Sequence, residues 1–474
     1  MFQFVWITTD ILLWILAIST CIAGFLMRRN EQWRAPWQQV WRSRQGVVSG
    51  LVLLTFAMIG LLDSIHIRYA LDTMMVVDPS PDDPVMEFYS LPVSVLDLLI
   101  WPLGQGFEET YSAPFALHLF VKKLIGMVNG QPILEYPPLQ WITNGITTAA
   151  ERAVNIEHIL FYAVVKALGV WLIILTSIWL YQTKKLKDAK LAWRTLWKDQ
   201  TDRVPMLTFL LTLGVILLII ICIKDLSIAY HIMGTDKIGM DVFYQGIKSI
   251  RTGLIMGTVT TLFMLPCALL GGMLAGYFRG WVDDVVQYIY TTLNAIPSVL
   301  LIAASVLVLQ LYISQHENWF STIEQRADAR LLMLCMILGL TNWTTLCRLL
   351  RGETLKLREA DYVLAARTLG VPSYLILWRH ILPNILPMIL VIMVLDFSNF
   401  VLIEAVLSYV GVGVDPTTLS WGNMINRARL ELAREPMVWW SLTTAFLLMF
   451  TLVLAANLFA DKVRDAFDPR LQKV

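Results

Sequence analysis

The sequence predicts an all-α integral membrane protein. Only 15% of its 474 residues are charged and 57% are hydrophobic, whereas soluble domains carry about 25% charged residues. Several apolar runs of roughly twenty residues are each long enough to cross a hydrocarbon core about 30 Å thick. Basic residues gather in some of the loops between these runs. Together, these observations predict a multi-pass helical chain.

Nine membrane spans are predicted along the chain. Their approximate limits are 5–27, 47–66, 158–181, 205–223, 252–277, 288–312, 330–348, 383–408 and 438–460. The first run could instead be a secretory signal, but no basic segment precedes it and it is longer than a typical signal core. We therefore expect the first run to be an uncleaved span.

Lys and Arg residues predict the orientation, because short cytoplasmic loops carry an excess of them. Basic regions follow the first, third, seventh and ninth spans, at about 28–44, 184–203, 351–379 and 462–473. Nine spans place all four regions on one side, so the N-terminus should be external and the C-terminus cytoplasmic. The external side then holds residues 67–157, with an acidic, proline-rich stretch at 78–84. We expect a small external layer or surface-lying helices there.

The motifs of common active sites are missing from the sequence. It contains no GxxxxGK[ST] for nucleotide phosphates, no HExxH and no GxSxG. The six histidines are scattered, and the five cysteines lie in or beside apolar runs without CxxC spacing. The sequence therefore predicts no catalytic residue, no metal site and no enzyme activity.

A short helix is predicted in the cytoplasmic loop, at about 359–369. Good helix formers fill it, and Gly370 followed by Pro372 should end it. Four side chains recur at helical spacing on one face: Tyr362, Ala365, Ala366 and Leu369. A helix of roughly eleven residues is marginal alone in water, so it needs a surface to dock on. A lipid surface is one alternative, although the acidic residues beside the stripe favour a protein partner.

This loop resembles the EAA loop of ABC importer permeases. The stretch READYVLAARTLG, followed by RHILPN, is similar to the second permease subunit of dipeptide and oligopeptide importers. Further similarities follow in the family's order between about residues 205 and 474. They lie at 234–242, 275–283, 295–298, 404–413, 420–424 and 457–471.

The resemblance implies a six-span permease core over 205–474. Residues 1–204 would then be an N-terminal extension with about three spans, the external region 67–157 and a basic cytoplasmic loop at 182–204. Such an extension could brace the permease dimer, dock a binding protein or hold another membrane subunit. The family's importers work as two permeases, two cytoplasmic ATPases and an external solute-binding protein in the bacterial cytoplasmic (inner) membrane. ATP and Mg²⁺ would bind to the ATPases; no cofactor is expected on this chain, and no nucleic acid among its partners.

Two groups of site residues follow from the resemblance. Those expected to couple to the ATPases, within the loop 351–382 and just after it, are Arg358, Glu359, Asp361, Tyr362, Ala365, Ala366, Gly370 and Pro383. Candidates for the translocation path or its gate are Asp241, Pro297, Asp396, Glu404, Gly411 and Gly413. Lys166 lies inside the third span and should snorkel or pair with an acid of another span.

Two residues depart from the family's pattern. Leu364 stands at the position of the EAA glutamate, which leaves the details of ATPase docking open. Met240 stands where the family usually has an arginine, which leaves the substrate preference open.

Four functions are compatible with the sequence. The first is a permease subunit of an ATP-driven peptide importer, and the second is the same fold importing nickel chelates, opines or antimicrobial peptides. A stand-alone secondary transporter would need ion-coupling charges near the membrane midplane, for which Asp396 alone is thin support. A membrane scaffold or sensor built on a permease core is the fourth, and only the long N-terminal extension suggests it.

Overall fold

The computed structural model describes residues 2–27, 29, 31–69, 93–100, 103–104, 106–128, 131–141, 146, 148–197, 204–316 and 322–467. Nine helices in these ranges are long and apolar enough to cross a membrane. They correspond one to one with the nine predicted spans, so the predicted all-α membrane fold is confirmed. The stretch 78–84 and the C-terminal part of the 457–471 similarity, from 468 on, lie outside the described residues.

Two compact units make up the chain. Unit 1 comprises Met1–Trp14, Leu51–Thr252 and Leu419–Leu448, and unit 2 comprises Ile15–Gly50, Gly253–Thr418 and Met449–Val474. Four helices contribute residues to both units, namely α1 (Thr8–Met27), α3 (Arg44–Asp63), α9 (Val242–Phe278) and α17 (Trp440–Phe467). The division at residue 204, which rests on the family resemblance, stays a prediction.

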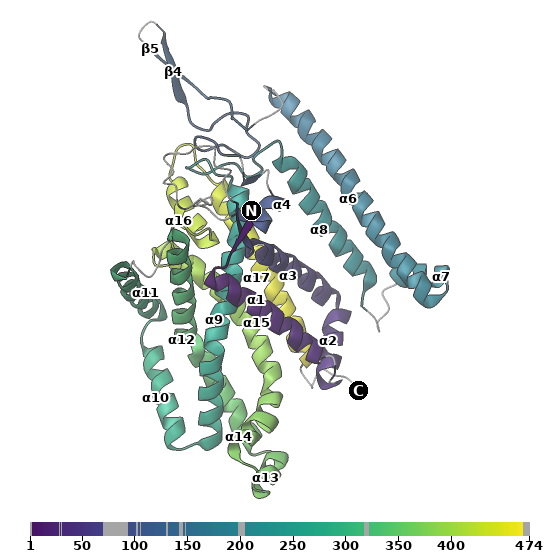
Figure 1. Ribbon diagram of the computed structural model, residues 1–474, viewed down its shortest axis with the longest axis vertical. Coiled ribbons are helices and arrows are strands. Elements are labelled where there is room, and N and C mark those ends of the chain that lie inside the picture. Colours follow the sequence, from purple (N-terminus) through teal and green to yellow (C-terminus); the bar gives the residue numbers. More distant parts are fainter. Residues whose placement is uncertain are drawn as a thin grey trace, which may run out of the picture. The chain divides into compact units, whose positions relative to one another are not determined.

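Unit 1 carries a small layer of short strands in the region expected to be external. β1 (Phe2–Val5) pairs antiparallel with β2 (His66–Tyr69), which pairs in turn with β3 (Val93–Ser94). Helix α4 (Val95–Leu99) follows directly and starts with a capping box between Ser94 and Asp97. A hairpin of β4 (Lys123–Val128) and β5 (Gln131–Glu135) completes the strands (Figure 1). Because residues 2–5 pair with β2, the first helix begins at Thr8 rather than near residue 5.

Three consecutive helices of unit 1 pack together: α6 (Ala149–Leu186), α7 (Ala189–Trp197) and α8 (Met206–Ser227). Helices α6 and α8 lie side by side in Figure 1. The indole of Trp171 donates a hydrogen bond to the carbonyl of Leu210 at 2.8 Å. Lys166 pairs with Asp225 of α8 at 2.8 Å, so of the two predicted outcomes the structure has the ion pair.

Unit 2 contains most of the remaining long helices. Helix α2 (Glu31–Arg42) packs Trp37 against Phe459 and Phe467 of α17. The predicted span 288–312 corresponds to α11 (Ser298–Gln315) and starts later than predicted, because α10 (Trp281–Ala295) ends before Pro297 and α11 starts after it. Proline has no N–H to donate and its fixed φ suits the start of a helix. Two further long helices of the unit are α12 (Ile323–Arg358) and α15 (Leu382–Val410).

Candidate functional site

The predicted coupling loop forms an ordered tip between α12 and α15. After α12 ends at Arg358, the chain forms α13 (Asp361–Thr368), α14 (Ser373–Ile376) and a wide π-helical turn, η2 (Leu377–Ile381). Figure 1 shows α13 at the end of unit 2, beside α14. The helix predicted at 359–369 is confirmed as α13, which starts two residues later and ends one residue earlier than predicted.

The end of α13 is set by Gly370, as the sequence predicts. Gly370 has a φ of +78°, which residues with a Cβ rarely adopt. Its N–H donates to the carbonyl of Arg367, and the next N–H, of Val371, donates to Ala366, both at 3.1 Å. This is the Schellman arrangement. Asp361 in the first turn and Arg367 in the last turn complement the helix dipole.

The two faces of α13 differ sharply in exposure. Val363 and Ala366 are buried in the core cluster of unit 2, together with Ile376 and Ile381. The outward side chains include Leu369, which is 83% exposed, and Tyr362. The predicted stripe is therefore divided, because Ala366 faces the chain's own core while the other three stripe residues face outward.

Apolar exposure continues beyond α13. Tyr374 and Trp378 are 72% and 70% exposed, and Leu364, at the EAA glutamate position, is also exposed. A helix of eight residues held by two buried side chains, with aromatic and aliphatic groups pointing outward, can receive a protein partner without moving relative to its own core.

Pro383 explains the wide turn before α15. A proline cannot donate to the carbonyl four residues earlier, and its ring clashes with that carbonyl in a regular helix. The turn relieves this by a longer bond, in which the N–H of Leu382 donates to Leu377. Asn384 reaches back to the carbonyl of His380 at 2.6 Å and to the Tyr362 hydroxyl at 3.1 Å. These contacts fix the tip to the first turn of α15.

Ion pairs join the C-terminal part of α12, which leads into the tip, to the start of α10 and to the turn before it. Arg351 of α12 donates two hydrogen bonds to Asp283 at the start of α10, at 2.5 and 2.7 Å, and they lower the pKa of that carboxyl. Glu359 pairs with Arg279 at 2.8 Å, with both side chains about half exposed. Partly buried Arg358 ends α12, and the exposed Asp361, Ala365 and Pro383 lie on the surface of the tip.

The candidate path residues of α15 have different surroundings. Asp396 is partly buried in the helix. Glu404 is 2% exposed and accepts a hydrogen bond from the Ser408 hydroxyl at 2.8 Å. Gly411, with a φ of +86°, ends the helix. A Cβ on Gly413 would lie 2.0 Å from Ser408 Oγ, so this glycine allows a close approach of the chain to α15.

The Gly234–Asp241 similarity forms a tight turn in unit 1. Asp236 accepts hydrogen bonds from the N–H groups of Ile238 and Met240 at 2.9 and 3.0 Å. Gly239 has a φ of +81°, and a Cβ there would lie 1.7 Å from the carbonyl oxygen of Glu108. The turn is therefore built to receive a segment of the N-terminal extension.

Asp241 is held by a buried histidine at this turn. Its Oδ2 lies 2.8 Å from His231 Nδ1, and its Oδ1 accepts from the N–H of Tyr244 at the start of α9. Glu108 Oε1 lies 3.8 Å from the other ring nitrogen of His231. Burial alone would lower the pKa of His231, but the hydrogen bond to Asp241 and the negative charge of both carboxylates raise it to about 9. This candidate path residue thus caps a helix and anchors a turn.

The same motif region is tied to the segment 419–448. Ser420 caps α16 (Trp421–Glu431) by accepting from the N–H of Asn423 at 3.1 Å. The indole of Trp421, 1% exposed, donates to the carbonyl of Gly246 at 3.0 Å. The 420–424 similarity therefore has a packing role at the first turns of α9.

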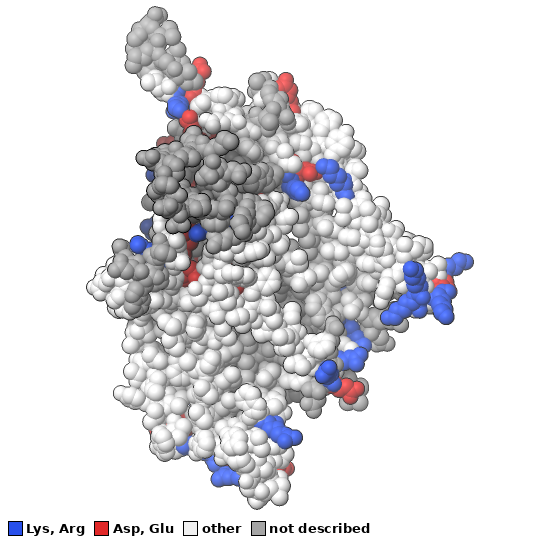
Figure 2. Space-filling view, viewed as in Figure 1, with Lys and Arg blue, Asp and Glu red and all other residues white. Residues whose placement is uncertain are grey.

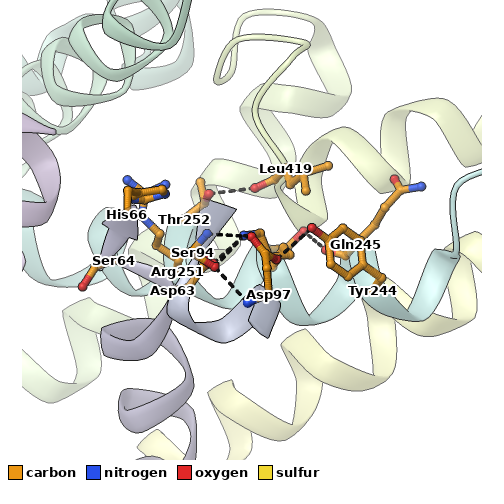
Figure 3. Close-up of polar contacts among 12 residues, drawn as sticks. Asp63, Ser64, His66, Ser94, Asp97, Tyr244, Gln245, Arg251, Thr252 and Leu419 are labelled. Carbon is orange, nitrogen blue, oxygen red and sulfur yellow. Dashed lines mark hydrogen bonds and ion pairs between the residues drawn. The ribbon is translucent and has the colours of Figure 1, made fainter. Parts of the chain in front are cut away.

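A buried charge cluster joins the extension to α9 in unit 1. Lys248 Nζ lies 2.6 Å from Asp63 Oδ1, 2.9 Å from Asp97 Oδ2 and 3.0 Å from Ser94 Oγ. Tyr244, one turn earlier, donates its hydroxyl to Asp97 at 2.9 Å. Figure 3 shows Asp63, Ser94, Asp97 and Tyr244 as one connected set. Burial would raise the pKa of Asp97, but the charge and hydrogen bonds around it lower it.

A second pairing lies one turn further along α9. Arg251 binds Asp10 Oδ1 of α1 through two nitrogens, at 2.6 and 2.7 Å. His66 Nδ1 of β2 lies 3.1 Å from Asp10 Oδ2. Because positions 244, 248 and 251 share one helix face, the extension supplies three acids, Asp10, Asp63 and Asp97, along a single side of α9.

Sequence reasoning missed this cluster. A signal was present, because Asp10 and Asp63 lie inside the predicted spans 5–27 and 47–66. An ionisable residue in a span costs several kcal/mol and therefore calls for a partner. The partners Lys248 and Arg251 precede the predicted fifth span directly, but nothing in the sequence identifies which acid meets which base.

Nine helices of the described residues are long and apolar enough to span a membrane, and a rigid, partly apolar tip lies between two of them, as a transport permease requires. Comparisons with known proteins agree. The family model described as "Binding-protein-dependent transport system inner membrane component" matches residues 268–473. The glutathione transport system permease protein of Pectobacterium atrosepticum is 31% identical over 242 residues, which are 51% of this chain and 73% of that protein.

Two further relatives are named as peptide permeases. The oligopeptide transport system permease protein of Bacillus subtilis is 30% identical over 243 residues, 51% of this chain and 73% of that protein. A putative peptide permease protein of Brucella suis is 32% identical over 244 residues, 51% of this chain and 74% of that protein. The chain therefore belongs to the family of binding-protein-dependent transport system inner-membrane components, and it is a multi-pass ABC importer permease.

Proposed function

We propose that the chain is one of two different permease subunits in an ATP-driven importer of peptides. The permease names of its relatives support this substrate class. ATP hydrolysis takes place on two separate cytoplasmic ATPases, and an external solute-binding protein delivers the peptide. The tip with α13 is cytoplasmic in this arrangement, as the basic loop charges predict, and so is the C-terminus.

The observation that carries the proposal is the construction of the tip. Its inner face is fixed by Val363 and Ala366, while Leu369, Tyr374 and Trp378 point outward. Exposed aromatic and aliphatic side chains at one end of a rigid element are typical anchors for a groove on a partner. When the ATPase groove moves, a helix fixed to its own core passes that movement to α12 and α15.

A second exposed face, which is also apolar, supports the proposal that this chain pairs with another permease subunit. Helices α10 and α11 carry outward apolar side chains, with Tyr288 74%, Leu300 65% and Val308 65% exposed. An exposed apolar face of a membrane helix contacts either lipid or another protein. A second permease subunit covers this face in the proposed importer.

Co-purification in mild detergent tests the proposal. We expect the tagged full-length chain to bring down ATPase subunits and a second permease, identified by mass spectrometry. The double variant Leu369→Glu, Trp378→Glu should release the ATPases and keep the permease. Ala366 is unsuitable for this purpose, because it is buried and a larger residue would disturb the chain's own core. As a matched control, Leu430→Glu alters an exposed apolar residue of α16, away from both the tip and the α10–α11 face, and should keep the ATPases.

Substrate class needs its own measurement. Cells with the intact importer should accumulate a labelled di- or tripeptide in an ATP-dependent manner, and the double variant should not. Recovery of the chain alone, under conditions that keep another importer intact, would contradict the importer assembly. Recovery of the assembly without peptide uptake would contradict the peptide substrate only.

A further inference from the structure

An ordered basic turn joins α6 to α7 in unit 1. Four exposed lysines lie within the seven residues 184–190: Lys184, Lys185, Lys187 and Lys190. Lys187 has a φ of 55°, uncommon for a residue with a Cβ, and this reverses the chain at the end of α6. Asp188 accepts a hydrogen bond from the N–H of Lys190 at 2.8 Å. The lysines are thus held on a defined turn.

Unit 1 itself places this turn at one membrane surface. Helix α6 starts at the Thr148 capping box, where Arg152 donates to the carbonyl of Phe115 at 3.0 Å in the region expected to be external, and its 38 residues extend about 57 Å. That length exceeds a hydrocarbon core of about 30 Å. The lysine turn therefore lies at the membrane surface opposite the external region around Phe115. By the distribution of basic residues this surface is the cytoplasmic one.

Three tryptophans lie next to the lysines. Trp179 and Trp193 meet edge to face with ring centroids 6.3 Å apart, and Trp193 and Trp197 lie 5.6 Å apart. Trp193 and Trp197 are 46% and 48% exposed. Tryptophan rings gather at the depth of the lipid headgroups, where one edge is apolar and the other wet. The indoles therefore set the lysines at headgroup level.

The other side of helix α7 packs against the neighbouring helices and holds α7 in this position. Leu196 is 2% exposed and packs towards Trp171, Leu175 and Leu210 of the neighbouring helices. The gap left between them is about 10 Å³, too small for a ligand. Trp197 lines the same gap, and both Trp193 and Trp197 stay about half exposed.

We propose that this lysine turn is a binding site for the headgroup of an anionic phospholipid. Lysine ammonium groups donate to phosphate oxygens as compact charges. Asp188 is the one acid between residues 184 and 197, so the field of the turn is positive. Figure 2 shows Lys and Arg gathered over this end of the molecule. Basic residues beside a membrane helix on the cytoplasmic side attract anionic lipids, each contributing about fivefold in affinity.

Lipid retention by the full-length chain tests the site. The chain is purified in mild detergent, exchanged into micelles containing phosphatidylcholine with or without phosphatidylglycerol, and the bound lipids are counted by native mass spectrometry. We expect retained phosphatidylglycerol on the native chain. The variant with all four lysines changed to glutamine should lower its affinity at least about tenfold. The matched variant with the four lysines changed to arginine, which keeps the charge, should retain it.

Three outcomes would overturn the proposal. The first is equal phosphatidylglycerol retention by the native chain and the glutamine variant, which would make the lysines a merely solvated face. The second is equal retention of phosphatidylcholine, which would remove the preference for an anionic headgroup. The third is displacement of the lipid by millimolar inorganic phosphate, which would indicate a site for free anions instead of lipid. Thermal unfolding of both variants without added lipid checks that the fold is intact.

Discussion

Removal of the Lys248 ammonium should lower the free energy of unfolding of unit 1 more than removal of a charge from an exposed ion pair. This group has three N–H donors, and each has a partner, on Asp63, Asp97 and Ser94, at 2.6 to 3.0 Å. The Lys248 side chain is 13% exposed and that of Asp63 is 3% exposed. Loss of one partner from a buried ion pair costs about 3–5 kcal/mol, because the other charge stays buried without a counter-ion. We expect Lys248→Met to lower the free energy of unfolding by this amount.

Thermal unfolding in detergent measures the effect, and a second ion pair provides the control. Lys123 and Glu109 lie 2.6 Å apart in the same extension, but their side chains are 57% and 47% exposed. Exposed pairs contribute about 0–1 kcal/mol, so Lys123→Met should change the midpoint little. Adding Asp63→Asn to Lys248→Met should restore part of the lost stability, because one unpaired charge is removed. Equal midpoints for Lys248→Met and Lys123→Met, or no coupling between positions 248 and 63, would refute the reasoning.

Three further predictions concern the buried histidine, the tight turn and the tip. Because the folded-state pKa of His231 is raised to about 9 from 6.5, its charge stabilises the fold fully below pH 6.5, and this contribution is lost as the pH rises through 9. The unfolding midpoint should therefore fall between pH 7 and 10, and His231→Gln should flatten that fall. Gly239→Ala, which places a Cβ 1.7 Å from a carbonyl oxygen, should lower the midpoint by several degrees, whereas Gly352→Ala, with nothing within 4 Å, should not. Val363→Ala should loosen the inner face of α13, so transport should fall while ATPases still co-purify, in contrast to the loss of ATPases on Leu369→Glu.

The sequence predicts the spans and the tip because local patterns determine both. Apolar length alone identifies a helix that crosses a membrane, and each predicted span has a counterpart in the described residues, although the one predicted at 288–312 begins only at Ser298. Gly370 and Pro372 end α13 through backbone geometry, which depends on these residues and hardly on distant ones. The break at Pro297 has an equally local cause. The apolar run nevertheless continues on both sides of the proline, so hydropathy alone does not reveal the break.

Local sequence patterns do not predict which residues far apart in the chain come into contact. The inward turn of Ala366 depends on a core built from α9, α12 and α15, whereas helical spacing alone groups this residue with Tyr362 and Leu369. Likewise, Lys248 meets acids more than 150 residues away along the chain. Partner choice in such clusters depends on which helices become neighbours, and no residue spacing encodes that choice.

The charge cluster changes how the N-terminal extension should be understood. Lys248 and Arg251 lie in the part of the chain that resembles permease cores, yet their carboxylate partners Asp10, Asp63 and Asp97 all lie in the extension. A chain cut at residue 204 would leave two cations on one face of α9 without counter-ions, each at a cost of several kcal/mol. The turn at Gly239 would also lose the Glu108 segment that it contacts. The extension therefore completes the first turns of α9, so that a version of this permease without residues 1–204 must first neutralise positions 248 and 251.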